Sequence, residues 1–120
     1  MQKRPTHKDL SGKINQAKAA VKTGRIGLVD QTVIVADLLD LGCEISALSK
    51  ILLDLLEQAT PDAYAGTSPP QRSYETRIAG CELYAFKCVS KRIGCTVYIK
   101  FTLKNDFLWL VSLHEDRPGR

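Results

Sequence analysis

The sequence contains no apolar run close to the roughly 20 residues that a membrane-spanning helix needs. Its first five residues also lack the apolar stretch of a secretion signal. We therefore expect a cytoplasmic protein without a membrane partner. With 120 residues, the chain is long enough to bury one hydrophobic core and short enough to predict a single domain over residues 1–120.

Cysteine and histidine are scarce, and their spacing is not that of a metal site. The cysteines are Cys43, Cys81, Cys88 and Cys95. They form no Cys-x-x-Cys pair, and neither His7 nor His114 lies at ligand spacing from one of them. We expect free thiols in a reducing compartment, with neither a metal nor a cofactor. A redox or metal role is the less favoured alternative.

Positive and negative charges are unevenly divided along the chain, and one sign is scarce in each of its first two parts. Residues 1–25 carry seven Lys or Arg against one Asp, whereas residues 26–66 carry one Lys against seven acids. Residues 67–120 are basic again, with nine cations against five acids. This separation suits a polyanionic partner on one side of the molecule, and a merely solubilised surface is the alternative.

Apolar residues recur with helical spacing in the first half of the chain, which predicts a helical part over residues 9–58. The first helix is expected over residues 9–22, ending at Gly24. The second is expected from Asp30 over residues 31–41, although its β-branched run leaves a strand as the alternative. The third carries the clearest apolar stripe, which consists of Leu48, Ile51, Leu52, Leu55 and Leu56.

Residues 59–73 contain three prolines and a glycine and are predicted to be a loop. Strands are expected near residues 79–89, 94–104 and 108–114, so that an antiparallel sheet spans residues 79–115. Helices followed by strands predict an α+β fold, with the N-terminal helices packed on a C-terminal antiparallel sheet of three or more strands.

The last two strands form a predicted hairpin, and polar and apolar residues alternate strictly in the first of them, over residues 96–103. A three-residue loop over residues 105–107 would set Lys104 opposite Leu108 and Phe101 opposite Val111. It would also set Tyr98 opposite His114, whereas a two-residue loop would move every partner by one and mix the faces. We therefore expect a polar face with acid/base groups beside a cation, made of Tyr98, Lys100, Ser112 and His114.

Other residues of the sheet are assigned by the same alternation. Tyr84 and Glu82 would share the face of Tyr98 if the loop at residues 90–92 has an odd length. Trp109 is expected in the core opposite Leu103. Candidate cations for contacting the polyanionic partner are Lys87, Arg92 and Arg117, for which a solvated surface or a free tail is the alternative.

Residues 1–10 (MQKRPTHKDL) closely resemble the opening of the MqsR family, the motility quorum-sensing regulator toxins. Residues 97–102 (VYIKFT) and 110–115 (LVSLHE) resemble the family in the same order. The resemblance covers most of the chain, with a gapped middle. It implies a RelE-like two-layer fold, a metal-free mRNA interferase activity and a cognate antitoxin.

The resemblance also implies site residues, and two of them are missing here. The family has a functional lysine in a Phe-Tyr-Lys-Ser stretch, where this chain has Ala-Tyr-Ala-Gly at residues 63–66. A family glutamine falls near residues 83–85 and is absent. The family tyrosine corresponds to Tyr98, and the family's C-terminal lysine corresponds to His114. The chain is therefore either a diverged member with another acid/base set or a weakened enzyme.

Metal-free RNA cleavage needs a base for the 2′-hydroxyl, an acid for the leaving 5′-oxygen and a cation for the charged phosphorane. His114 is expected to be the acid or base, because histidine titrates near neutral pH. Tyr98 would bind the phosphate or stack on a base, and Lys100 would neutralise phosphate. For each of these, an exposed or packing side chain without a role is the alternative.

We therefore expect the endoribonuclease toxin of a type II toxin–antitoxin system, whose partners are mRNA and an antitoxin. A catalytically weak or inactive RelE-like module that binds RNA or a partner is the second hypothesis. A co-regulator that reaches operator DNA only through its antitoxin is the third.

Overall fold

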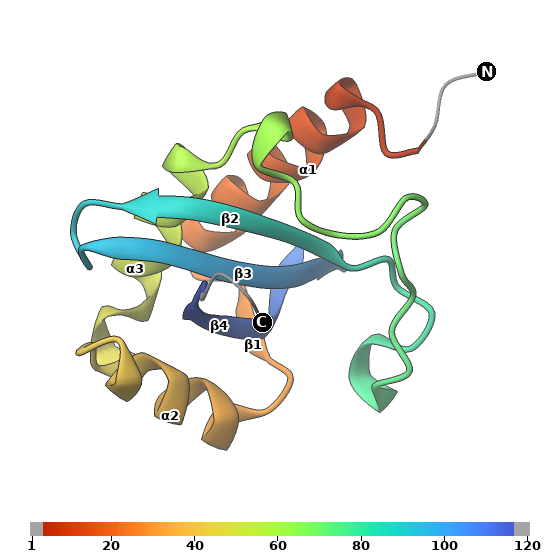
Figure 1. The fold of residues 1–120 in the computed structure, drawn as a ribbon. Coiled ribbons are helices and arrows are strands. Elements are labelled where there is room, and N and C mark those ends of the chain that lie inside the picture. Colours follow the sequence, from red (N-terminus) through yellow and green to blue (C-terminus); the bar gives the residue numbers. More distant parts are fainter. Residues whose placement is uncertain (1–3, 117–120) are drawn as a thin grey trace.

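The computed structural model describes residues 4–116, in which helices and a four-stranded sheet form two layers (Figure 1). The α-helices are α1 (His7–Lys22), α2 (Gln31–Asp40) and α3 (Leu48–Gln58). The strands are β1 (Ile26–Leu28), β2 (Tyr84–Ser90), β3 (Cys95–Lys104) and β4 (Phe107–Glu115). The predicted α+β class, with helices packed on the sheet, is confirmed.

Polar side chains begin the first two helices. The hydroxyl of Thr6 accepts a hydrogen bond from the backbone of Asp9, and the Asp9 carboxylate accepts one from the backbone of Thr6. These bonds hold the pKa of Asp9 below its ordinary value. Asp30 caps α2 by accepting from the backbone of Val33. The strand alternative for residues 31–41 is therefore wrong.

The sheet has the order β1-β4-β3-β2, and it is mixed rather than fully antiparallel. Strands β2, β3 and β4 are antiparallel, whereas β1 runs parallel to β4 with Ile26 beside Leu108. The sequence did not predict β1, because three residues are too few to show alternation. Its neighbour α2 packs along β4.

The connection before β2 is longer than predicted. The strand predicted near residues 79–89 is β2, which begins only at Tyr84, so the irregular segment runs on past residue 73. It folds back on itself, because the backbone of Ser73 donates to Cys81 and the backbone of Leu83 donates to Gln71. Two short 3₁₀ turns interrupt it, η2 (Pro61–Ala63) and η3 (Thr76–Ile78).

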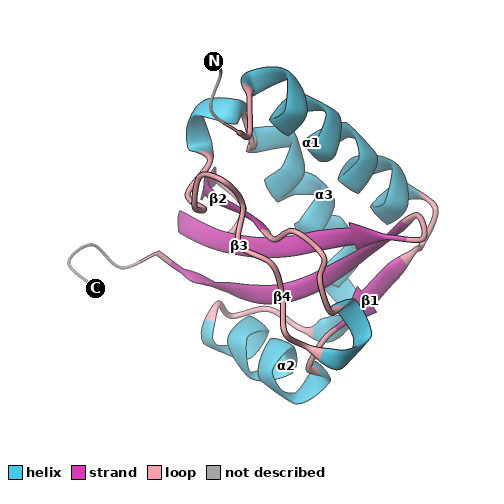
Figure 2. Ribbon diagram, turned by 90° about the vertical axis from the view of Figure 1, so that its right-hand side faces the viewer, coloured by secondary structure: helices cyan, strands magenta, loops and turns pink. Residues whose placement is uncertain are grey.

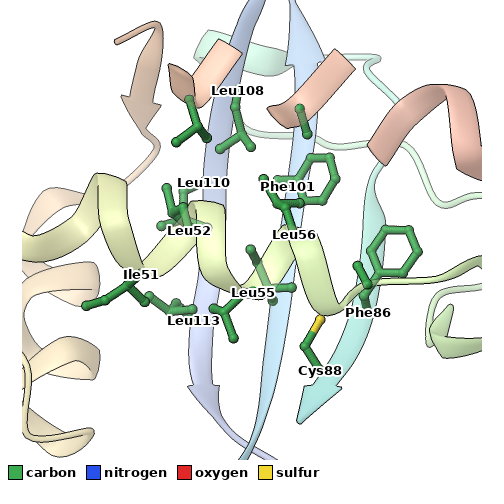
Figure 3. Close-up of a cluster of buried hydrophobic side chains, with 14 of the residues drawn as sticks. Ile51, Leu52, Leu55, Leu56, Phe86, Cys88, Phe101, Leu108, Leu110 and Leu113 are labelled. Atoms are coloured by element: carbon green, nitrogen blue, oxygen red, sulfur yellow. The ribbon is translucent and has the colours of Figure 1, made fainter. Parts of the chain in front are cut away.

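Most of the core lies between α1, α3 and one face of the sheet, and Ile34 and Leu38 of α2 join the same cluster. Figure 2 shows α1 and α3 together on one side of the strands and α2 apart from them, beside β4. Figure 3 shows the apolar stripe of α3 directed at the strands, with Leu52, Leu55 and Leu56 against Leu110 and Phe101. All five of these side chains are fully buried. The sheet is thus covered on one face, here called the core face.

A two-residue turn, not the predicted three-residue loop, joins β3 to β4. Asn105 and Asp106 both have positive φ (53° and 65°), as the tight hairpin turn requires, and Lys104 pairs with Phe107. Asn and Asp tolerate this conformation, which is why the shorter turn is available. The predicted pairing of Lys104 with Leu108 is therefore wrong.

A β-bulge restores the predicted register farther along the hairpin. Phe101 pairs with Leu110 and Lys100 pairs with Ser112, so Val111 has no partner across the ladder. The predicted pairing of Phe101 with Val111 is wrong for this reason. Beyond the bulge, Tyr98 pairs with His114. That predicted pair is confirmed, although it arises from a shorter turn and an extra residue in the strand.

Candidate functional site

Polar side chains gather on the sheet face turned away from α1 and α3, here called the outer face. In β3, the core face takes Val97, Ile99 and Phe101, all fully buried. Because side chains alternate along a strand, Tyr98 and Lys100 point to the outer face. Their partners in β4, His114 and Ser112, join them there. The predicted polar face is therefore present.

The rings of Tyr98 and His114 stack, with centroids 5.0 Å apart and planes 15° from parallel. The ammonium of Lys100 lies 6.0 Å from the centroid of the Tyr98 ring, on the same face. His114 is exposed, whereas Tyr98 and Lys100 are half-buried. An acid/base group, a phenol and a cation thus share one accessible surface.

A backbone contact sets the hydrogen positions on the His114 ring. Nδ1 lies 3.0 Å from the carbonyl oxygen of Glu115. Because a carbonyl oxygen only accepts hydrogen bonds, Nδ1 carries a hydrogen and donates. In the neutral ring, Nε2 then keeps its lone pair and is able to take a proton.

Tyr98 and His114 line a groove of about 590 Å³ at one end of the sheet, here called the site groove. Its walls come from three places: the end of α2, the outer face of the strands and the residues after β4. The lining residues are Asp40, Leu41, Lys87, Tyr98, His114, Glu115 and Asp116. Asp40 and Leu41 were not predicted, because only the packing of α2 along β4 brings them there and no sequence signal marks it.

Cations and acids both face the site groove. Lys87 pairs with Tyr98 across β2 and β3, and its ammonium lies 3.6 Å from the carboxylate of Asp116. Arg92 is exposed in the turn between β2 and β3, at the same end of the sheet. Arg117 lies outside the described residues. The structure therefore brings Lys87 to Tyr98 and His114, and Arg92 does not line the groove.

Tyr84 and Glu82 do not belong to this site. The loop between β2 and β3 has four residues, 91–94, because Ser90 pairs with Cys95. The even length turns Tyr84 to the core face, where its ring lies 6.3 Å from that of Phe101. Burial, together with the Glu82 carboxylate, raises the pKa of Tyr84 to about 12. The predicted place of Tyr84 on the face of Tyr98 is therefore wrong.

Glu82 lies before β2, and its carboxylate is bound elsewhere. One oxygen is 2.9 Å from the guanidinium of Arg4 and accepts a weaker hydrogen bond, 3.4 Å long, from the Tyr84 hydroxyl. These bonds hold the N-terminal end of the described chain against the start of the sheet. We assign Glu82 to this structural contact and not to the site groove.

Trp109 is on the outer face, which corrects its prediction as a core residue. The short turn pairs it with Thr102 instead of Leu103. Its ring lies over Gly27 of β1, where an added Cβ atom would come within 2.5 Å of a ring carbon. The absence of a side chain at Gly27 therefore leaves the space that the Trp109 ring occupies on the sheet.

Ala65, where the family resemblance expects a lysine, lies beside the sheet. Its backbone N–H donates to the carbonyl of Ala85 over 2.7 Å, and the preceding Tyr64 forms a bridge with Phe86. Since Phe86 is on the core face, alternation puts Ala65 with Ala85 on the outer face, and Ala85 pairs with Lys100. The missing cation would thus stand in the cross-strand row of Lys100.

Neither the scan against protein-family models nor the search of curated proteins gives a significant match to this chain. Within residues 4–116, no helix has the length and apolar character needed to cross a membrane. Over the same residues, no three His, Cys, Asp or Glu side chains are grouped so that they could hold a metal ion. The four cysteines are free thiols.

Proposed function

We propose that this protein is a metal-independent endoribonuclease, the mRNA interferase toxin of a type II toxin–antitoxin system related to the MqsR family. The stacked Tyr98–His114 pair in an open groove, with Lys100 beside it, is the observation that carries the proposal. The toxin acts in the cytoplasm, a cognate antitoxin neutralises it, and operator DNA is reached only through that antitoxin.

The proposed reaction is attack of an RNA 2′-oxygen on the adjacent phosphorus. The Nε2 lone pair of His114 takes the 2′-hydroxyl proton as the new O–P bond forms. The bond from phosphorus to the 5′-oxygen breaks, and the leaving oxygen receives a proton. The products are a 2′,3′-cyclic phosphate and a 5′-hydroxyl. In this proposal water supplies that proton from the opposite side of the phosphorus, and the imidazolium of His114 gives its proton back to the resulting hydroxide.

Two neighbours supply the remaining chemistry in this proposal. Lys100 offsets the charge that builds up on the phosphorane, and its position at the Tyr98 ring directs its ammonium to that side of the sheet. The Tyr98 ring orients His114 by stacking, and its hydroxyl is a donor for a phosphate oxygen.

The test is incubation of the purified protein with a long single-stranded RNA in EDTA. We expect cleavage that survives chelation and falls by about 10²-fold or more in His114→Ala, the range of a positioned acid/base group. The matched control is His7→Ala, because His7 is an exposed histidine outside the site groove. Cleavage left unchanged by both Tyr98→Ala and His114→Ala would refute the proposed site.

The acidic half of the site groove favours a second candidate, a module that binds without cutting. Asp40, Glu115 and Asp116 face the same space as Lys87, and such charges repel phosphate. Salt-sensitive RNA binding by the purified protein, without cleavage products, would support this candidate. Operator binding by the antitoxin complex alone would support a co-regulator instead.

A further inference from the structure

A second groove, of about 540 Å³, lies at the other end of the hairpin, between α1 and the β3–β4 turn. We call it the turn groove. Polar groups of Gln16, Thr23 and Asn105 line it, together with the cations Lys13, Arg25 and Lys104. Its residues do not overlap with those of the site groove. The two grooves are thus separate features of the described chain.

Cations predominate among the charged residues that line the turn groove, whereas acids predominate in the site groove. Three cations face one acid, Asp106, and that acid is 3.6 Å from Arg25. The ammonium of Lys104 donates to the backbone carbonyl of Arg77 over 2.8 Å. A carbonyl is neutral, so this bond fixes the ammonium without cancelling its charge. The turn groove therefore attracts anions more strongly than the site groove, where three acids face Lys87.

Packing holds the third cation on the opposite wall of the groove. Lys13 projects from α1, and its ammonium lies 5.7 Å from the centroid of the Tyr84 ring. Tyr84 itself is buried in the sheet. Lys13 and Lys104 thus stand on two rigid elements, a helix and a hairpin, with the groove between them.

An aromatic surface continues from the turn groove onto the outer face. Lys104 pairs with Phe107, so the two side chains share a face of the hairpin. Phe107 keeps 39% of its surface exposed, and its ring centroid is 6.4 Å from that of Trp109. A basic groove beside an exposed aromatic ring is a combination that binds single-stranded nucleic acid, because phosphates meet the cations and a base stacks on the ring.

We infer that the turn groove and Phe107 form an exosite for the backbone and one base of single-stranded RNA. This inference rests on the proposed function, because it names how the same substrate is held away from the cleaved bond. The site groove then supplies the chemistry, while the turn groove supplies most of the electrostatic affinity.

Binding is measured with a fluorescent 12-nucleotide RNA in which every 2′-hydroxyl is methylated. This RNA binds but has no free 2′-hydroxyl to attack the phosphorus. We expect the double variant Lys13→Gln, Lys104→Gln to bind about tenfold or more weakly at low salt, with a salt slope shallower by about 1.4. The control, Lys22→Gln with Lys50→Gln, removes the same charge outside both grooves and keeps the affinity. Equal losses in both double variants would overturn the exosite.

Phe107 is tested separately. Phe107→Ala is expected to weaken binding about fivefold or more, whereas Phe107→Trp keeps a stacking surface and keeps the affinity. The control is Leu39→Ala, which truncates a side chain that is 63% exposed on α2. Circular dichroism verifies that each variant is folded. An affinity that Phe107→Ala leaves unchanged in a folded protein would overturn the stacking contact.

The outcomes separate this inference from the proposed function. If binding of the methylated RNA depends on Lys13 and Lys104 but ordinary RNA is not cleaved, the nuclease hypothesis is wrong and the exosite stands. Cleavage of ordinary RNA with lysine variants that match their control would reject the exosite and keep the nuclease. If poly-glutamate binds with the same dependence on Lys13 and Lys104 and the RNA does not, the groove takes an acidic protein and the RNA assignment is wrong.

Discussion

Tyr98 lies flat against His114, and this contact restrains a ring that is otherwise exposed to solvent. Two neighbours fix the imidazole in different ways. The phenol ring limits its tilt, and the carbonyl of Glu115 holds the hydrogen on Nδ1. The remaining nitrogen is therefore presented in one orientation, which is the condition for efficient proton transfer.

The first prediction separates the two roles of Tyr98. Tyr98→Phe keeps the stacked ring and removes the hydroxyl, so we expect RNA cleavage to fall about tenfold or more, as on loss of a transition-state donor. The affinity for uncleavable RNA should stay the same. Tyr98→Ala should lower cleavage further, because the His114 ring loses its support. Single-turnover rates and binding curves measure the two effects, and equal cleavage by wild type and Tyr98→Phe would exclude a role for the hydroxyl.

The second prediction restores the cation that the family resemblance expects. Ala65→Lys places an ammonium in the row of Ala85 and Lys100 on the outer face. We expect cleavage several-fold faster than in the wild type, because added positive charge stabilises the developing phosphorane. The matched control is Ala65→Gln, which has similar length and no charge. A rate that rises equally in both variants would show that charge is not the cause.

The third prediction concerns Gly27 and Trp109. Gly27→Ala would force a methyl group to within 2.5 Å of the Trp109 ring, so the free energy of unfolding should fall by about 1–3 kcal/mol. The chain has a single tryptophan, and its fluorescence reports any movement of the ring directly. Gly12→Ala is the control: no atom lies within 4 Å of its added Cβ, and α1 should gain about 0.5–1 kcal/mol. Urea unfolding measures both, and an unchanged midpoint for Gly27→Ala would contradict the packing.

The fourth prediction concerns Cys88. Burial in the core raises the pKa of its thiol to about 11. Because the folded value is above the unfolded one, this thiol stabilises the fold fully below about pH 9. That contribution is lost as the pH rises to about 11. At pH 8, a thiol reagent should label the three half-buried cysteines first and Cys88 only on unfolding. Mass spectrometry of the labelled peptides identifies the order, and early labelling of Cys88 would contradict its burial.

Much of the helical layer could be predicted from local signals. The apolar residues from Leu48 to Leu56 lie on one face of α3, so only that face packs against the sheet. Asp30 marks the start of α2, because its side chain accepts a hydrogen bond from the backbone of Val33. By contrast, β1 (Ile26–Leu28) is too short to show an alternation of polar and apolar residues. Its pairing with β4 depends on the position of the end of α1 relative to the β3–β4 hairpin. Elements that depend on distant partners were the ones missed.

In the candidate site too, residues placed by local alternation could be predicted, whereas residues placed by distant elements could not. Tyr98, Lys100 and His114 follow from alternation within one hairpin, and the structure brings them together. Tyr84 was misplaced because the length of the β2–β3 turn decides its face, and residues 90–94 contain no signal that fixes that length. Asp40 reaches the site groove only through helix packing, which no local pattern encodes.

The bulge at Val111 changes the parity of β4. Before it, even-numbered residues such as Leu108 and Leu110 are buried, and after it the odd-numbered Leu113 is. The alternation of buried and outward side chains in β4 therefore shifts by one residue at Val111. Only the part of the strand after the bulge sets the face on which His114 lies. Evolution or design could lengthen the turn by one residue and delete Val111 while leaving His114 opposite Tyr98. Related chains are therefore best aligned by counting back from Tyr98 and His114, and not by the length of the turn between their strands.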